Sequence, residues 1–194
     1  RGEARRSGPV PGCWKLRDAA WGVVLFAGGS QRHRSLLVLA VTFALSVSAF
    51  SAPNEAAQEQ VAAAIKAPNV SVVHLWAPWC SNCQAELKSG GWGKIVKENP
   101  EVKFYFVSVW DKGDDGRAIL AKNEIANLPN VTILADAGPR GADHIKQFLG
   151  LPLSWIPTTW VFKGGDLRYA LNYGEIRFPV LQQFITDSND KWEH

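Results

Sequence analysis

Two cysteines separated by two residues are the part of this sequence best suited to redox chemistry. Trp79-Cys80-Ser81-Asn82-Cys83 follows an apolar run that ends at Trp76 and precedes a stretch that predicts a helix. A cysteine at a helix N-terminus faces unpaired backbone N–H groups and the positive end of the helix dipole, and both favour the thiolate. The thiolate is the attacking species in disulfide exchange, so Cys80 is the candidate nucleophile. Cys83, one turn into the helix, is the candidate resolving thiol.

Other uses of the cysteine pair fit the sequence less well. A structural disulfide is possible, but a helix start directly after Trp79 favours exchange chemistry. Haem attachment is excluded, because Gln84 and not a histidine follows Cys83. A metal site would need His74 or His144 as a further ligand, and the spacing and the number of ligands make this the weaker alternative.

The cysteine count and the charge limit the class of protein. The chain has 194 residues and three cysteines, and Cys13 lies in an expected leader. The folded part then holds one cysteine pair, which is too few for a disulfide-stapled scaffold. Residues 53–194 contain fourteen Lys/Arg and sixteen Asp/Glu, so the net charge of +3 comes from the leader. Nothing in the folded part therefore indicates a nucleic-acid patch.

The N-terminal part has the residue order of a secretory signal peptide. Residues 32–34 are basic, residues 36–47 are apolar, and small residues follow, with cleavage after Ala49 or Ser51 fitting the pattern. An uncleaved membrane anchor is the alternative, although the apolar stretch is shorter than the roughly 20 residues of a spanning helix. We expect an exported, periplasmic protein with an upstream segment of no assigned function, a signal peptide or anchor, and one folded domain at residues 1–31, 32–52 and 53–194.

The folded part alternates between strand and helix patterns. Strands are expected over residues 70–76, 102–110, 131–135, 158–162 and 167–172. Helices are expected over residues 55–65, 92–98, 117–127, 141–149 and 178–187, and from residue 80 to a break at Gly90-Gly91. The last two strands form a hairpin around paired glycines. This order predicts an α/β domain with a mixed sheet.

Two separated motifs resemble the thioredoxin superfamily. They are Trp-Ala-x-Trp-Cys-x-x-Cys, which ends at Cys83, and the segment Trp155-Ile156-Pro157-Thr158-Thr159 before the hairpin. The resemblance covers residues 55–190 and implies a thioredoxin-like three-layer fold, in which helices flank a mixed central sheet and a strand-helix insertion precedes the cis-Pro motif. Three features narrow the resemblance to the exported TlpA/ResA-like branch of thiol–disulfide oxidoreductases. They are the leader, this insertion, and Glu86, three residues after Cys83.

The resemblance also implies roles for residues around the cysteines. Pro157 would be cis and pack against the disulfide, and the backbone at Ile156 would hold the substrate polypeptide. Trp79 and Trp155 could form an apolar rim for that substrate, and otherwise they serve packing.

Two side chains are candidates for proton transfer to or from the cysteines. Glu86 could relay a proton if it is partly buried beside the pair, and a solvated position on the helix is the alternative. His74 stands where thioredoxin has a buried Asp in the strand, so the carrier could be Glu86, His74 or neither.

The expected function is reduction of protein disulfides by an exported thiol–disulfide oxidoreductase. The redox group would be the Cys80–Cys83 disulfide, with no other cofactor and no metal. Ser81-Asn82 differs from the Gly-Pro of thioredoxin, which leaves the direction of electron flow open. A copper- or metal-handling module on the same fold and a protein-disulfide oxidant are the alternatives. The expected partners are protein disulfides and a membrane-bound thiol electron donor, without nucleic acid, and the protein would be a monomer.

Overall fold

A computed structural model describes residues 53–172 and 176–190, so the expected leader lies outside the described residues. A five-stranded sheet with the order β3-β2-β1-β6-β7 forms the centre. The strands are β1 (Val70–Trp76), β2 (Lys103–Ser108), β3 (Val131–Ala135), β6 (Thr158–Lys163) and β7 (Asp166–Leu171). The helices are α1 (Pro53–Ala64), α2 (Ser81–Lys88), α3 (Gly91–Glu98), α4 (Arg117–Lys122) and α5 (Phe178–Asp187). Among these residues, no helix is long and apolar enough to cross a membrane.

Strand β1 lies at the centre of the sheet because it is apolar on both faces. All seven of its residues are buried. It pairs in parallel with β2 and antiparallel with β6, and β3 extends the parallel side beyond β2. The β6–β7 hairpin turns at Gly164 and Gly165, which both have positive φ. The sheet is therefore mixed, as predicted.

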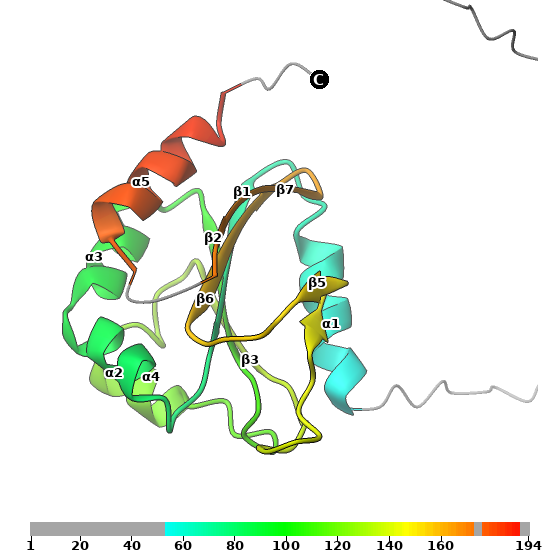
Figure 1. The fold of residues 1–194 in the computed structure, drawn as a ribbon. Helices are drawn as coiled ribbons and strands as arrows, with labels where there is room; N and C mark the ends of the chain where they lie inside the picture. The colour runs from blue at the N-terminus through cyan, green and yellow to red at the C-terminus, as the bar shows by residue number, and fades with distance from the viewer. Residues whose placement is uncertain (1–52, 173–175, 191–194) are drawn as a thin grey trace, which may run out of the picture. The chain divides into compact units, whose positions relative to one another are not determined.

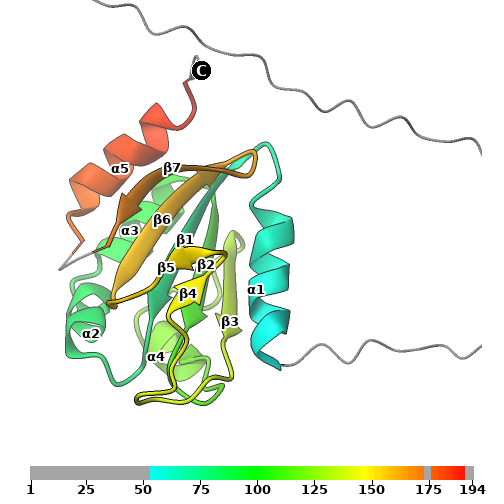
Figure 2. The same cartoon turned by 45° about the vertical axis from the view of Figure 1, so that its right-hand side comes forward.

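Helices cover both faces of this sheet, which gives three layers (Figures 1 and 2). Helices α2, α3, α4 and α5 contribute to an apolar cluster on one face, with Trp92 and Leu181 fully buried in it. Val61 of α1 and Ile65, just after it, belong to a second cluster on the other face, together with Trp160. The predicted fold class, a thioredoxin-like α/β fold, is confirmed, and α4 and β3 lie between β2 and the Ile156–Pro157 motif.

The expected helix over residues 141–149 is wrong. This segment contains turns and the two-residue strand β4 (Gln147–Phe148), which pairs with β5 (Leu151–Pro152). Two of its backbone groups bond to side chains of other parts of the chain: the Ile145 carbonyl accepts the Trp110 indole N–H, and the Leu149 N–H donates to the Gln58 side chain. Leu149 also has φ 53°, a left-handed conformation that ends any helix.

Helix α4 is also shorter than predicted. It ends at Lys122 because Glu124 has φ 58°, and the chain then turns Ile125 into the core, where it is fully buried. By contrast, the predicted break between α2 and α3 is present, with Gly90 at φ 74°.

Candidate active site

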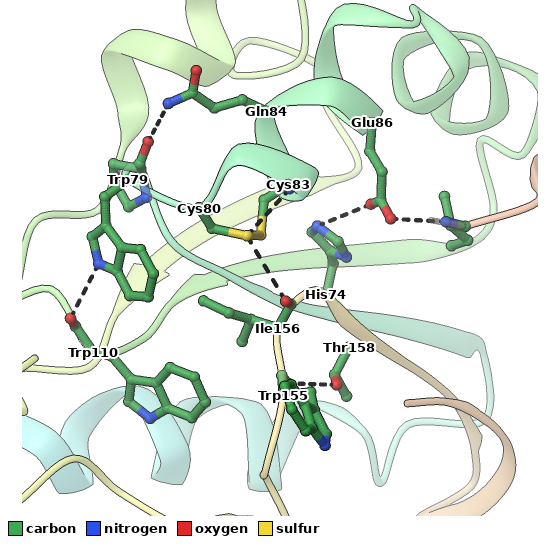
Figure 3. The surroundings of a disulfide bond; sticks show 12 residues. His74, Trp79, Cys80, Cys83, Gln84, Glu86, Trp110, Trp155, Ile156 and Thr158 are labelled. Carbon is green, nitrogen blue, oxygen red and sulfur yellow. Dashed lines mark hydrogen bonds and ion pairs between the residues drawn. A yellow bond between two sulfur atoms is a disulfide. The ribbon is translucent and has the colours of Figure 1, made fainter. Parts of the chain in front are cut away.

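Cys80 and Cys83 form a disulfide at the start of α2 (Figure 3). Cys80 is the N-cap residue of this helix, and its Sγ accepts a hydrogen bond from the Cys83 N–H at 3.2 Å. Cys80 is 7% exposed, whereas Cys83 has no exposed surface. A disulfide partner from solution can therefore reach only the first sulfur, as expected for a nucleophile followed by a resolving thiol.

The loop before β6 lies against the first cysteine. The Ile156–Pro157 peptide bond is cis, and the Ile156 carbonyl oxygen lies 3.8 Å from Cys80 Sγ. The Thr158 hydroxyl donates to the Trp155 carbonyl at 2.8 Å, which ties the loop to the first residue of β6. Pro157 is buried, whereas Trp155 is exposed and Ile156 is half-buried. Trp155 and Ile156 therefore form the surface of the loop beside Cys80 Sγ.

His74 is completely enclosed by the protein on β1. Its Nδ1 lies 2.9 Å from the Thr159 hydroxyl, and its ring packs against Trp92 and Phe106 at centroid distances of 4.4 and 5.5 Å. Burial lowers the pKa of His74 to about 3, because a charged imidazole would lose its hydration there. The ring is therefore neutral at pH 7.

Glu86 is buried rather than solvated, which excludes the simple surface position considered for it. Its Oε1 accepts the Ile176 N–H at 2.8 Å, and its Oε2 accepts the Trp92 indole N–H at 3.4 Å. Oε2 also lies 3.8 Å from His74 Nε2. The structure thus brings the two proposed proton carriers together. In the view of Figure 3, the His74 ring lies between the disulfide and the Glu86 carboxylate.

A groove of about 570 Å³ opens beside Cys80. It is lined by Trp79, Cys80, Ser81, Asn82, Trp110, Arg140, Ser154, Trp155 and Ile156. The Trp155 side chain is 62% exposed, which is unusual for so large an apolar residue. The volume lies within the roughly 300–1,000 Å³ of typical ligand pockets. The predicted rim residues Trp79 and Trp155 therefore line one groove with Cys80.

Two further groove residues, Trp110 and Arg140, are absent from the sequence predictions. The Trp110 carbonyl accepts the Trp79 indole N–H at 3.3 Å, and the Arg140 guanidinium lies 3.9 Å from the Trp79 ring centroid. Position offers one signal for Trp110: it follows β2, the parallel neighbour of β1, and ligands bind where such strands end. Arg140 directly precedes residues 141–149, the segment in which the predicted helix is absent.

Neither histidine completes a metal site with the cysteines. His144 packs against Trp110 with ring centroids 4.4 Å apart, and His74 faces Glu86. Within the described part of the chain, no group of three or more His, Cys, Asp or Glu side chains could hold a metal ion.

Comparisons with known proteins give structural likeness at low sequence identity. No protein-family model and no curated protein matches the chain. A secreted disulfide oxidoreductase of Mycobacterium tuberculosis homologous to E. coli DsbE is 19% identical, with a TM-score of 0.48 over 64% of this chain and 85% of that one. A DsbF homologue from Corynebacterium diphtheriae is 21% identical, with a TM-score of 0.48 over 64% and 74%. StoA from Bacillus subtilis is 14% identical, with a TM-score of 0.40 over 61% and 83%.

Proposed function

We propose that this protein is an exported thiol–disulfide oxidoreductase that reduces disulfides of other proteins. One observation carries the proposal: Cys80 caps a helix with its sulfur, borders an open groove and is bonded to a buried Cys83. A purely structural disulfide has no need of a groove at its exposed sulfur. The three-layer fold and the position of the Ile156 carbonyl, 3.8 Å from Cys80 Sγ, support the same function.

The reaction begins with the reduced pair. The Cys80 thiolate attacks one sulfur of the substrate disulfide, an S–S bond forms between enzyme and substrate, and the other substrate sulfur leaves as a thiolate that takes up a proton. The Cys83 thiolate then attacks Cys80 Sγ, which releases the second substrate thiol and oxidises the enzyme pair. Two electrons pass to the substrate, so a thiol donor must reduce the pair again. We propose a membrane-bound thiol carrier as that donor.

Helix α2 favours the first step. Reduced Cys80 keeps its place as N-cap, where the Cys83 N–H at 3.2 Å would stabilise the negative sulfur. The Ile156 carbonyl at 3.8 Å is an acceptor for the thiol proton when Cys80 is protonated. The second step requires Cys83 to lose its proton in a buried site, where a charge is unfavourable. We propose that Glu86 takes up this proton, and that the neutral His74 ring, 3.8 Å from its Oε2, positions the carboxylate.

The first experiment measures the reduction potential of the Cys80–Cys83 pair by equilibration with glutathione or dithiothreitol buffers. A reductant should have a potential near or below that of thioredoxin, about −270 mV. A potential near that of a strong periplasmic oxidant, about −120 mV, would reverse the proposed direction of electron flow.

A turnover assay tests the mechanism itself. The protein should accelerate the reduction of insulin by dithiothreitol, and Cys80→Ser should abolish this acceleration. Cys83→Ser should instead trap mixed disulfides through Cys80, detectable as a mass increase by mass spectrometry. A Cys80→Ser variant with the wild-type rate would rule out the mechanism.

Export is part of the proposal and rests on the residue order of 32–52. Mass spectrometry of the mature protein from a secreting host should place its N-terminus at residue 50 or 52. A protein that keeps residues 32–47 and sediments with membranes would instead indicate the anchor.

A further inference from the structure

Trp110 has a backbone conformation that large side chains rarely adopt. Its φ is 61°, in the left-handed region that is uncommon for residues other than glycine, asparagine and aspartate. Such a conformation persists only where the surroundings enforce it, and it often marks a functional position. Trp110 follows β2 and lines the groove beside Cys80.

Several contacts hold this conformation. The Trp110 indole N–H donates to the Ile145 carbonyl at 2.8 Å, and the indole ring packs against the tilted His144 ring. The Trp110 backbone N–H bonds to the buried Asp136 carboxylate, which also accepts the Gly138 N–H at 3.0 Å. The side chain and the backbone are thus both anchored to the segment after β3.

The conformation of Trp110 fixes the position of Trp79, which directly precedes Cys80. With Trp110 in this conformation, its carbonyl accepts the Trp79 indole N–H at 3.3 Å. Arg140 covers the ring at 3.9 Å from its centroid. The Trp79 ring is therefore held at its edge and over its face, whereas Trp155, which lines the same groove, is 62% exposed.

We propose that Trp110 is a positioning residue that holds Trp79 as a fixed apolar wall, and that the groove thereby selects extended polypeptides with a large apolar residue beside the reacting cysteine. This inference rests on the proposed function and names its substrate class. A wall that is already ordered loses little entropy on binding. Most of the favourable free energy from burying an apolar side chain against it therefore contributes to affinity. A small disulfide that does not fill the groove gains no affinity from such burial.

The test uses symmetric disulfide dimers of Gly-Xaa-Cys-Gly, so that attack on either sulfur gives the same product. Xaa is Phe or Gln, and bis(2-hydroxyethyl) disulfide serves as the small substrate. Reduced protein is mixed with each disulfide, quenched with acid, and the released thiol is measured by chromatography. The Phe dimer should react about tenfold faster than the Gln dimer, as burial of one large apolar side chain implies.

Trp110→Gly tolerates the positive φ but removes the ring and its contacts, so the Phe/Gln ratio should fall below about twofold. Trp110→Phe keeps a ring in place and should restore part of the ratio. Trp155→Ala removes an exposed ring from the same groove and tests the substrate class even if the Trp110 variants do not fold. Leu167→Ala removes an apolar side chain that is 39% exposed on β7 and should leave the ratio unchanged.

The reduction potential separates positioning from redox chemistry. Trp110→Gly should keep the wild-type potential while it loses the Phe/Gln ratio. Equal rates for the two dimers in the wild-type protein, or an unchanged ratio in both Trp110→Gly and Trp155→Ala, would overturn the inference and leave the proposed function intact. Failure to reduce any dimer or the small disulfide faster than Cys80→Ser would instead refute the proposed function, and this inference with it.

Discussion

His74 has lost its ordinary acid–base behaviour, because burial lowers its pKa to about 3. In the unfolded chain a histidine titrates near pH 6.5. Below that pH the unfolded chain binds a proton that the folded protein does not, so the free energy of unfolding falls as the pH falls. The loss amounts to about 1.4 kcal/mol for each pH unit between the two pKa values.

His74→Asn should remove this contribution. Between pH 6.5 and 4.5 the wild-type protein should lose about 2 kcal/mol more stability than the variant does. Urea unfolding at the two pH values measures the difference. His144→Asn, which removes a histidine away from His74, is the matched control. Equal losses in the wild-type protein and His74→Asn would mean that His74 is protonated in the fold.

At this scale the residue types predicted much of the candidate site. The position of Cys80 and Cys83 at a helix start could be predicted from their spacing, and the structure places them there. The contact between His74 and Glu86 could not, because it depends on how α2 packs over β1. The left-handed backbone of Trp110 has no signature in the residue type, since its cause is a set of bonds to Asp136 and Ile145.

The glycines between α2 and α3 show how an element boundary supports the site. Gly91 begins α3, and a Cβ at this position would overlap the Phe178 ring at the start of α5. Phe178 in turn packs edge-on against Trp92, which bonds to Glu86. The close approach of two helices therefore depends on a missing side chain.

Gly91→Ala should destabilise the protein by about 1–3 kcal/mol, the usual effect of overpacking. Gly93→Ala is the control two residues along the same helix, where a Cβ would meet only the Asn123 carbonyl oxygen at 3.8 Å. It should be neutral or stabilise by up to about 1 kcal/mol, because alanine favours the helix. Thermal or urea unfolding measures both changes, and a Gly91→Ala variant as stable as Gly93→Ala would contradict the packing argument.

Elements with strong local patterns were predicted, and elements held by distant partners were not. The buried run of β1 and the paired glycines of the β6–β7 hairpin carry their signals in the sequence itself. The segment 141–149 has no such signal, because its conformation follows from bonds to Trp110 and Gln58. These partners lie 35 and 91 positions away in the chain, so local pattern could not reveal them.

The two apolar clusters on either face of the sheet meet at the active site. Trp79 and Ile156 pack against both clusters. A loss of packing on either face should therefore lower the stability of the whole domain, and neither layer should unfold by itself. We expect the protein to unfold in a single cooperative transition.

Two substitutions test this expectation from opposite faces. Val61→Ala in α1 should lower the free energy of unfolding by about 1–3 kcal/mol, and Leu181→Ala in α5 by about 2–5 kcal/mol. Both side chains are fully buried. Each variant should shift the urea midpoint with an unchanged m-value, with tryptophan fluorescence and circular dichroism in agreement. A second transition in either variant would show that the layers unfold separately. Gln60→Ala, at an exposed position of α1, should leave the midpoint in place.

Strand β1, buried along its whole length between β2 and β6, leads directly into the segment that carries Cys80. Its amide hydrogens should be among the last to exchange with deuterated solvent, because only global opening exposes them. The helix ends and surface loops should exchange long before. Cys80, the proposed nucleophile, thus follows the strand that we expect to open last, and local fraying elsewhere should leave it in place.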